Sequence, residues 1–230
     1  MIYANRTVAG TLLGAYLREH LTPTDPVVIG VPRGGAITAS AVAHELHAPL
    51  DVVVVERIYA PENPSFPVAT VDEEGRLVTM GGNLPLPYHV ALEDLTDQVE
   101  RATSTAQRRA KTYRLHAPHI SLADRNVVVV DDGMLTGLTT CAIALYARAH
   151  GAATVTAATP VASRQAMAQL AHIADSVVAL DTPQPMESVR HHYRHFIPVP
   201  DAAVRAVLHH TIEPRLAGRG SQFTREGQYW

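Results

Sequence analysis

Two adjacent carboxylates, Asp131 and Asp132, directly follow a run of four valines at residues 127–130. Such a run is typical of a strand buried on both faces, and like charges at its end repel one another unless a ligand separates them. Small and hydroxyl-bearing residues follow at 133–140, where they favour a tight turn and the start of a helix. Exposed N–H groups at a helix start bind anions such as phosphate. Because the carboxylates can accept hydrogen bonds from vicinal hydroxyls or face a divalent cation, the stretch predicts a site for ribose 5-phosphate.

Taken alone, the Asp-Asp stretch is equally compatible with a solvated turn followed by an ordinary helix cap. Two other apolar segments, however, also end in residues that suit an anion. Residues 27–32 lead into Arg33, Gly34 and Gly35, and residues 50–56 lead into Arg57. In a parallel sheet, ligands bind at the carboxyl ends of strands near a topological switch point. We therefore expect the three strand ends to form one site.

The elements that must position these residues alternate along the chain. Helices are expected at 7–21, 36–47, 93–114, 138–150, 163–172 and 201–209, and strands at 27–32, 50–56, 126–131, 153–161 and 176–180. In a proline-rich stretch, residues 66–71 and 75–80 flank an acidic turn and predict a β-hairpin. Apolar strands separated by helices predict an α/β fold with a parallel sheet covered on both faces.

Composition excludes several other classes of protein. The 230 residues suit one domain with a small elaboration, which we place at 1–212, and a mobile tail at 213–230. A formal net charge of -3 provides no basic field, so we expect no nucleic-acid partner. No apolar run reaches the length of about 20 residues that a membrane helix needs, and the N-terminus lacks signal-peptide features. With Cys141 as its one cysteine, expected in the core, the chain fits a cytoplasmic location.

The stretch VVVVDDGMLTGLT resembles the phosphoribosyl-pyrophosphate (PRPP) binding motif of type I phosphoribosyltransferases: a hydrophobic strand, two acidic residues, then a Thr/Gly-containing loop. IGVPRGG at 29–35 is similar to the pyrophosphate loop of that family, and VVVERIYAPENP at 53–64 to its second strand and following basic position. NRTVAGTLL and TPQPMESVRHHYRHF are similar to an uncharacterised bacterial and archaeal branch of the family. The resemblance covers roughly residues 5–205. It implies a parallel twisted sheet flanked by helices, with a small hood and a flexible β-hairpin loop.

The resemblance also implies a role for each motif position. The catalytic set would be Arg33, Arg57, Asp131 and Asp132, with the two aspartates holding the ribose 2- and 3-hydroxyls. The 5-phosphate would lie in the loop formed by Gly133, Met134, Leu135, Thr136, Gly137, Leu138 and Thr139. Pyrophosphate would contact Arg33, Gly34, Gly35 and Arg57, in a loop that in this family often carries a non-proline cis peptide. Mg²⁺ would be held mostly by PRPP oxygens and water, with Asp131 and Asp132 as the candidate protein ligands.

Three positions depart from the pattern of the family. Leu135 stands where Ser, Thr or Ala is frequent, so one hydroxyl near the phosphate is missing. Glu56 and Arg57 stand where close relatives tend to have Arg and Lys.

The implied reaction joins C1 of the ribose to a nitrogenous acceptor and releases pyrophosphate. Arginines and Mg²⁺ would neutralise the leaving group, and a mobile cover, here about residues 59–80, would exclude water. The acceptor would lie under a hood formed by residues 183–200 and part of the N-terminus. There Tyr193 and Phe196 would either stack on its ring or pack the hood. A homodimer is expected from the resemblance.

Other readings remain open at this stage. The alternative function is a regulatory protein that binds PRPP or a nucleotide without turnover, although Arg33 and Arg57 favour the enzyme. A generic nucleotide-binding protein is disfavoured because neither GxGxxG nor GxxxxGK[ST] occurs. The histidines of the HHYRH stretch at 191–195 lack the partners of a zinc site. Arg108, Arg109 and Lys111 are expected on a solvated helix face.

Overall fold

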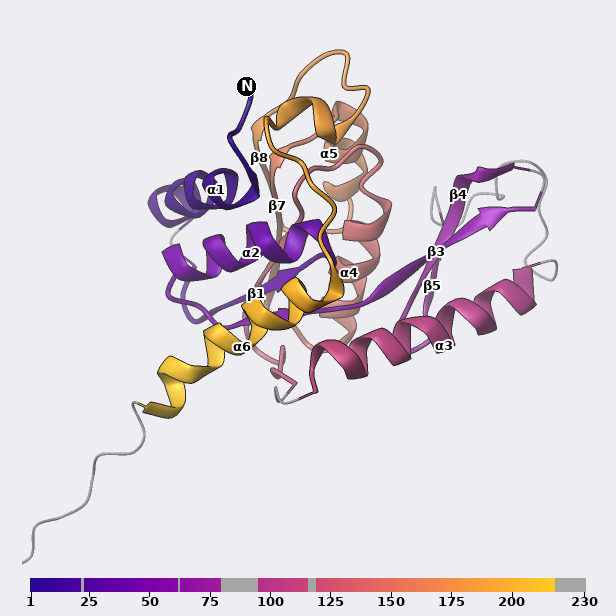
Figure 1. The fold of residues 1–230 in the computed structure, drawn as a ribbon, viewed down its shortest axis with the longest axis horizontal. Coiled ribbons are helices and arrows are strands. Elements are labelled where there is room, and N and C mark those ends of the chain that lie inside the picture. Colours follow the sequence, from indigo (N-terminus) through magenta and orange to yellow (C-terminus); the bar gives the residue numbers. More distant parts are fainter. Residues whose placement is uncertain (22, 62, 80–94, 116–118, 218–230) are drawn as a thin grey trace, which may run out of the picture.

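The computed structural model describes residues 1–21, 23–61, 63–79, 95–115 and 119–217 (Figure 1). The helices are α1 (Arg6–His20), α2 (Gly34–Glu45), α3 (Thr96–Tyr113), α4 (Leu138–Ala149), α5 (Arg164–Leu170) and α6 (Asp201–Ala217), with a 3-10 turn η3 (Val189–His192). The strands are β1 (Pro26–Gly30), β2 (Leu50–Val52), β3 (Val55–Ala60), β4 (Asn63–Asp72), β5 (Leu77–Thr79), β6 (Asn126–Val130), β7 (Thr154–Val161) and β8 (Ser176–Asp181). No helix within these ranges is long and apolar enough to cross a bilayer.

Five parallel strands form the central sheet in the order β2-β1-β6-β7-β8, which confirms the expected α/β fold. β1 and β6 are neighbours, with Val28 opposite Val128, although they lie far apart in the sequence. The chain runs outward from β1 to β2 and then returns to the other side of β1 through β6. The gap between the ends of β1 and β6 is therefore the topological switch point, where ligands bind in such sheets.

The run of four valines is apolar throughout because helices cover both faces of the sheet. Val128 and Val130 belong to the core beneath α1, α2 and α6, whereas Val127 and Val129 pack with Ile143 of α4 on the opposite face. All four valines are at most 2% exposed. Burying each contributes roughly 1.5 kcal/mol or more, so β6 provides a rigid base for the residues that follow it.

The segment expected as one strand at 50–56 is two strands in two different sheets. β2 ends at Val52 on the edge of the parallel sheet, and β3 begins at Val55 in a separate antiparallel sheet of order β3-β4-β5. Val53 and Val54 between them are buried, so the apolar pattern does not reveal the crossing. As a consequence Arg57 lies within β3 and not after a strand end.

The antiparallel sheet forms an arm that projects beside the main body, with α3 packed along it (Figure 1). The hairpin predicted around residues 72–75 is confirmed by the pairing of Val71 in β4 with Leu77 in β5, while residue 80 lies outside the described residues. α6 continues to Ala217, past the expected end at residue 209. Of the expected tail, residues 218–230 lie outside the described part of the chain.

Candidate active site

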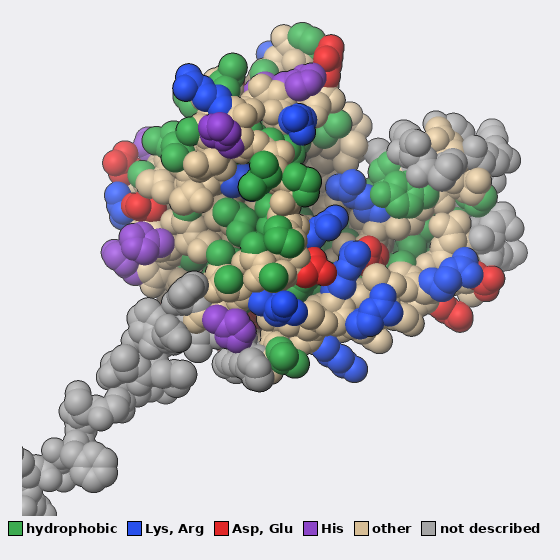
Figure 2. All heavy atoms as spheres, viewed as in Figure 1, with side chains coloured by type: hydrophobic (Ala, Val, Ile, Leu, Met, Phe, Trp, Pro, Cys, Tyr) green, Lys and Arg blue, Asp and Glu red, His purple; other side chains and the backbone are tan. Residues whose placement is uncertain are grey.

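A cavity of about 510 Å³ opens where the carboxyl ends of β1 and β6 face the antiparallel arm. Figure 2 shows basic side chains gathered along this hollow, with carboxylates beside them, and the basic residues that line the cavity are arginines. The cavity is lined by Arg6, Val31, Pro32, Arg33, Gly34, Val54, Val55, Glu56, Arg57, Tyr59, Arg109, Tyr113, Asp131, Asp132, Gly133, Thr139, Val189, Phe196, Pro198 and Val199. The three segments that the sequence selected thus contribute to one site.

The turn after β1 packs directly against the two carboxylates. A Cβ atom on Gly34 would lie 2.0 Å from Oδ2 of Asp132, and one on Gly35 would lie 2.9 Å from Cα of Asp131. Both positions therefore require glycine because of this close approach, whatever their own backbone conformation. The peptide bond between Pro32 and Arg33 is cis, as the family resemblance suggests.

The surroundings of Asp131 disfavour the ionised form of its carboxyl group. Burial raises its pKa well above the ordinary value, and the neighbouring Asp132 carboxylate raises it further. The backbone N–H of Asp132 donates a hydrogen bond of 2.8 Å to Oδ1 of Asp131, and Arg57 also favours the charged form, but neither offsets the burial. A diol that donates hydrogen bonds, or a divalent cation, would stabilise the ionised form of the pair.

The loop after the carboxylates lines an adjoining cavity of about 380 Å³. The two cavities share Arg57, Asp131, Gly133, Thr139, Val189 and Phe196, so they adjoin and form one groove. Gly137 has φ of +75°, which places it in the left-handed region just before α4. The first backbone bond of that helix runs from Cys141 N–H to the Gly137 carbonyl, and Leu138 N–H donates to Oγ1 of Thr136 at 3.5 Å. The N–H groups of Thr139 and Thr140 have no acceptor among the described residues and remain for a ligand.

Leu135 projects from this loop with 40% of its surface exposed. Its carbonyl accepts a hydrogen bond of 2.6 Å from Oγ of Ser163, which holds the loop against the start of α5. The loop is therefore fixed by its backbone, and the missing hydroxyl at residue 135 removes one donor without changing the anchor.

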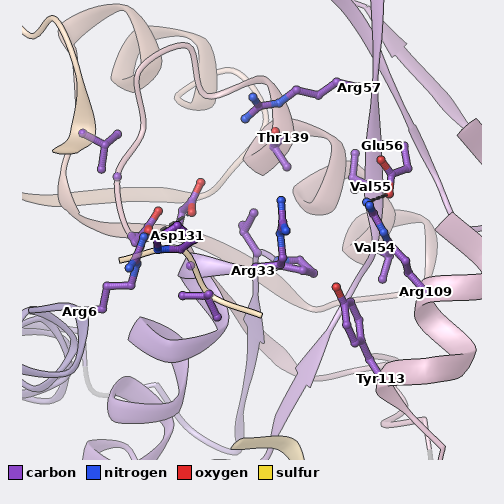
Figure 3. Close-up of a pocket in the computed structure, with 18 of the residues that line it drawn as sticks. Arg6, Arg33, Val54, Val55, Glu56, Arg57, Arg109, Tyr113, Asp131 and Thr139 are labelled. Atoms are coloured by element: carbon purple, nitrogen blue, oxygen red, sulfur yellow. Dashed lines mark hydrogen bonds and ion pairs between the residues drawn. The ribbon is translucent and has the colours of Figure 1, made fainter. Parts of the chain in front are cut away.

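Two arginines are available to an anion. The guanidinium groups of Arg33 and Arg57 form no hydrogen bond or ion pair with any residue that the structure describes. Figure 3 shows Arg33 in the middle of the cavity and Arg57 beside Thr139. Both residues are exposed to the cavity, so their unpaired guanidinium groups favour a strongly anionic ligand.

Three further residues of the site were not expected from the sequence. Arg6 makes a salt bridge of 2.6 Å to Asp132. Arg109, expected on a solvated helix face, instead reaches the cavity from α3 and forms an ion pair with Glu56 (Figure 3). The Tyr113 hydroxyl donates to Asp201 at 2.7 Å. Burial is the main cause that raises the pKa of Tyr113, and the Asp201 carboxylate raises it further. Nothing in the local pattern marks these residues, because each partner lies far away in the sequence.

The two aromatic residues proposed for the acceptor occupy different positions. Phe196 lines both cavities, and the Arg6 guanidinium lies 3.8 Å from its ring centroid. Tyr193 is buried against Tyr3, does not line the described cavities, and donates its hydroxyl to the Asp132 carbonyl. The geometry thus leaves Phe196 as the one of the two that a ligand can reach.

The described residues contain no group of three or more His, Cys, Asp or Glu side chains that could hold a metal, including the histidines at 191–195. The Asp131 and Asp132 pair nevertheless fits Mg²⁺, which takes one or two carboxylates and keeps water and substrate oxygens as its other ligands. The raised pKa of Asp131 agrees with this, because burial and Asp132 disfavour its ionised form and a cation would stabilise that form.

A parallel sheet with a carboxylate pair, a glycine-containing turn before a helix and unpaired arginines at its switch point defines an α/β protein with a charged site at its strand ends. Residues 2–192 match the family model described as the phosphoribosyl transferase domain. The chain therefore belongs to the phosphoribosyl transferase domain family, a class of glycosyltransferases.

Individual relatives agree with this family. A Mycobacterium tuberculosis protein provisionally named as a phosphoribosyl transferase is 37% identical over 208 residues, which cover 90% of this chain and 46% of the relative. The chain thus spans about half the length of that relative. An adenine phosphoribosyltransferase of Mycobacterium avium is 29% identical over 70% of this chain and 67% of its own length. The protein TT1426 from Thermus thermophilus has 37% sequence identity to this chain. Its crystal structure matches with a TM-score of 0.77, and the match covers 90% of this chain and 98% of the TT1426 chain.

Proposed function

We propose that the chain is a Mg²⁺-dependent phosphoribosyltransferase. It would transfer ribose 5-phosphate from PRPP to a nitrogenous, nucleobase-like acceptor and release pyrophosphate. The observation that carries the proposal is the close packing of the Arg33–Gly35 turn on Asp131 and Asp132. This packing places an unpaired cation beside a carboxylate pair at the head of an anion-binding loop.

Each part of the groove suits one part of PRPP. The loop at 133–139 would bind the 5-phosphate through backbone N–H groups and threonine hydroxyls. Asp131 and Asp132 would accept hydrogen bonds from the ribose hydroxyls. Arg33, Arg57 and the glycines of the 33–35 turn would contact the pyrophosphate.

The reaction needs electrostatic help and not a covalent nucleophile from the protein. As the bond from C1 to pyrophosphate breaks, positive charge develops on the ribose and negative charge on the leaving group. The carboxylate pair faces the first charge, and the guanidinium groups of Arg33 and Arg57 face the second. When bound, Mg²⁺ would supply further charge neutralisation to the pyrophosphate.

The arm and the hood would keep water away from the reacting centre. Tyr59 in β3 lines the cavity, which supports the hairpin region as the cover. Phe196, Pro198 and Val199 line the hood side and offer an apolar surface to a planar acceptor. The similarity to an adenine phosphoribosyltransferase favours a nucleobase over other amines. A homodimer in the cytoplasm stays a prediction.

The binding half of the proposal is tested by the double variant Asp131→Asn with Asp132→Asn. We expect the variant to lose PRPP binding measured by calorimetry in the presence of Mg²⁺, while its circular dichroism spectrum stays native. Asn keeps the size of each side chain, so loss of affinity would report loss of charge. Unchanged PRPP affinity in the folded double variant would contradict the proposal.

The catalytic half is tested by pyrophosphate release. The unaltered chain is incubated with PRPP, Mg²⁺ and a panel of purines, pyrimidines and small amines, and we expect at least one acceptor to raise release above the blank. Binding of PRPP without release for any acceptor would instead support the non-catalytic regulatory alternative.

A further inference from the structure

Arg6 is a buried arginine that connects the N-terminus, the hood and the carboxylate pair. Asn5 caps α1 by accepting a hydrogen bond of 3.0 Å from Val8 N–H, which fixes Arg6 at the first helical position. The Arg6 side chain is 9% exposed. Burying a guanidinium is strongly unfavourable unless its donors are paired, so its contacts define its role.

The contacts of Arg6 connect two parts of the site. Nε of Arg6 donates to Oδ2 of Asp132 at 2.6 Å, and Nη1 donates to the Ile197 carbonyl at 2.9 Å. The same guanidinium lies 3.8 Å from the ring centroid of Phe196. One side chain therefore binds the carboxylate on the ribose side of the proposed site and the hood segment on its acceptor side.

The remaining surroundings of Asp132 restrict it further. Gly34 leaves just enough room for Oδ2 and for Nε of Arg6, because a Cβ there would lie 2.0 Å from the first atom and 2.8 Å from the second. The backbone carbonyl of Asp132 accepts the Tyr193 hydroxyl from the hood. These contacts fix the orientation of the Asp132 carboxylate.

We propose that Arg6 is a positioning residue, which acts through Asp132 by orienting its carboxylate toward the ribose hydroxyls and by joining that carboxylate to the hood at Phe196 and Ile197. This role rests on the proposed binding of PRPP. It assigns a function to a residue outside the strand-end motifs, and it makes the N-terminus of α1 part of the transferase site.

The test compares two ligands and three variants. Arg6→Met keeps most of the apolar length of the side chain but removes the charge and the hydrogen-bond donors. Arg6→Lys keeps the charge but lacks the forked arrangement of donors on the guanidinium. Arg18→Met is the matched control, because Arg18 lies on the same helix and pairs with Glu45 at the same 2.6 Å, away from the cavity. PRPP and inorganic pyrophosphate, each with Mg²⁺, are the probes, since only PRPP carries the ribose.

We expect Arg6→Met to weaken PRPP binding by about 10- to 100-fold, the range typical of groups that orient a ligand-holding side chain. Pyrophosphate affinity should change by less than about threefold, because Arg33 and Arg57 are untouched. Arg6→Lys should recover part of the PRPP affinity, and Arg18→Met should match the unaltered chain.

Three outcomes would overturn the role of Arg6. Equal losses for both probes would show a general collapse of the site, and unchanged PRPP affinity in Arg6→Met would show a merely structural ion pair. If Arg6→Met does not fold, Arg6→Lys decides alone, and unaltered PRPP affinity there would contradict the need for the fork. Absence of PRPP binding by the unaltered chain would instead overturn the proposed function itself.

Discussion

Asp131 is half-buried beside the Asp132 carboxylate, and desolvation, followed by this neighbouring charge, raises its pKa. A carboxyl whose pKa is higher in the folded state than in the unfolded state binds its proton more tightly when folded. The free energy of unfolding therefore falls as the pH rises through the window between the two pKa values, and the penalty is fully present above the raised pKa. The unliganded protein is thus less stable at neutral pH than it would be without this charge.

Asp131→Asn should accordingly raise the stability of the unliganded protein while it removes PRPP binding. Asn keeps an Oδ1 that can accept the Asp132 N–H, so only the charge is lost. The expected gain at pH 7 is on the order of 1 kcal/mol, which is common when a strained functional group is relieved. Thermal melts at several pH values would measure it, and the gain should vanish as the pH falls toward the ordinary pKa of an aspartate. A variant that is less stable at pH 7 would contradict this account.

Between elements, the antiparallel arm is joined to the parallel sheet by a buried network around Arg114, just after α3. Its guanidinium pairs with Asp51 of β2 at 3.1 Å, and it also contacts Glu73 of the arm and the Val52 carbonyl. The three charged side chains are between 5% and 13% exposed. The network lies where the chain crosses from one sheet to the other, so it sets the position of β3 and of the residues that β3 brings to the cavity.

Arg114→Met should destabilise the protein by about 3–5 kcal/mol, because removing one member of a buried ion network leaves uncompensated carboxylates. Urea denaturation measures the loss. The matched control is again Arg18→Met, whose exposed pair should contribute less than about 1 kcal/mol. Similar small losses for both variants would show that the crossing is held by apolar packing and not by the ion network.

At the scale of the whole molecule, the sheet and most of its helices were predictable, because periodicity and strand-end glycines are local signals. The part of the site at the strand ends was predictable, because β1 and β6 are parallel and end at the same edge of the sheet. Arg6, Arg109 and Tyr113 were not, because their partners lie 126, 53 and 88 residues away. The crossing after Val52 was also hidden, since burial stays continuous through it.

The hood is also formed by residues that lie far apart in the sequence, at the N-terminus and around residue 193. The backbone N–H of Tyr3 donates to the His192 carbonyl at 2.8 Å, and Arg194 N–H donates to the Tyr3 carbonyl at 2.8 Å. The Tyr3 ring packs 5.6 Å from that of Tyr193, and its hydroxyl donates to the Pro160 carbonyl at 2.8 Å. Tyr193 in turn contacts Asp132, so the N-terminal residues support the carboxylate pair through the hood.

Tyr3→Ala should therefore lower both stability and ligand affinity. Removing a ring that is 2% exposed leaves a cavity and should reduce the free energy of unfolding by about 3–5 kcal/mol. PRPP binding should weaken as well, because Tyr193 and the Asp132 backbone lose their support. Tyr16→Ala provides the control, since that tyrosine is 40% exposed and its loss should cost less than about 1 kcal/mol. Calorimetry on both variants at a temperature where each is folded separates the two effects, and a destabilised Tyr3→Ala protein with unaltered PRPP affinity would show that the hood and the carboxylate pair are independent.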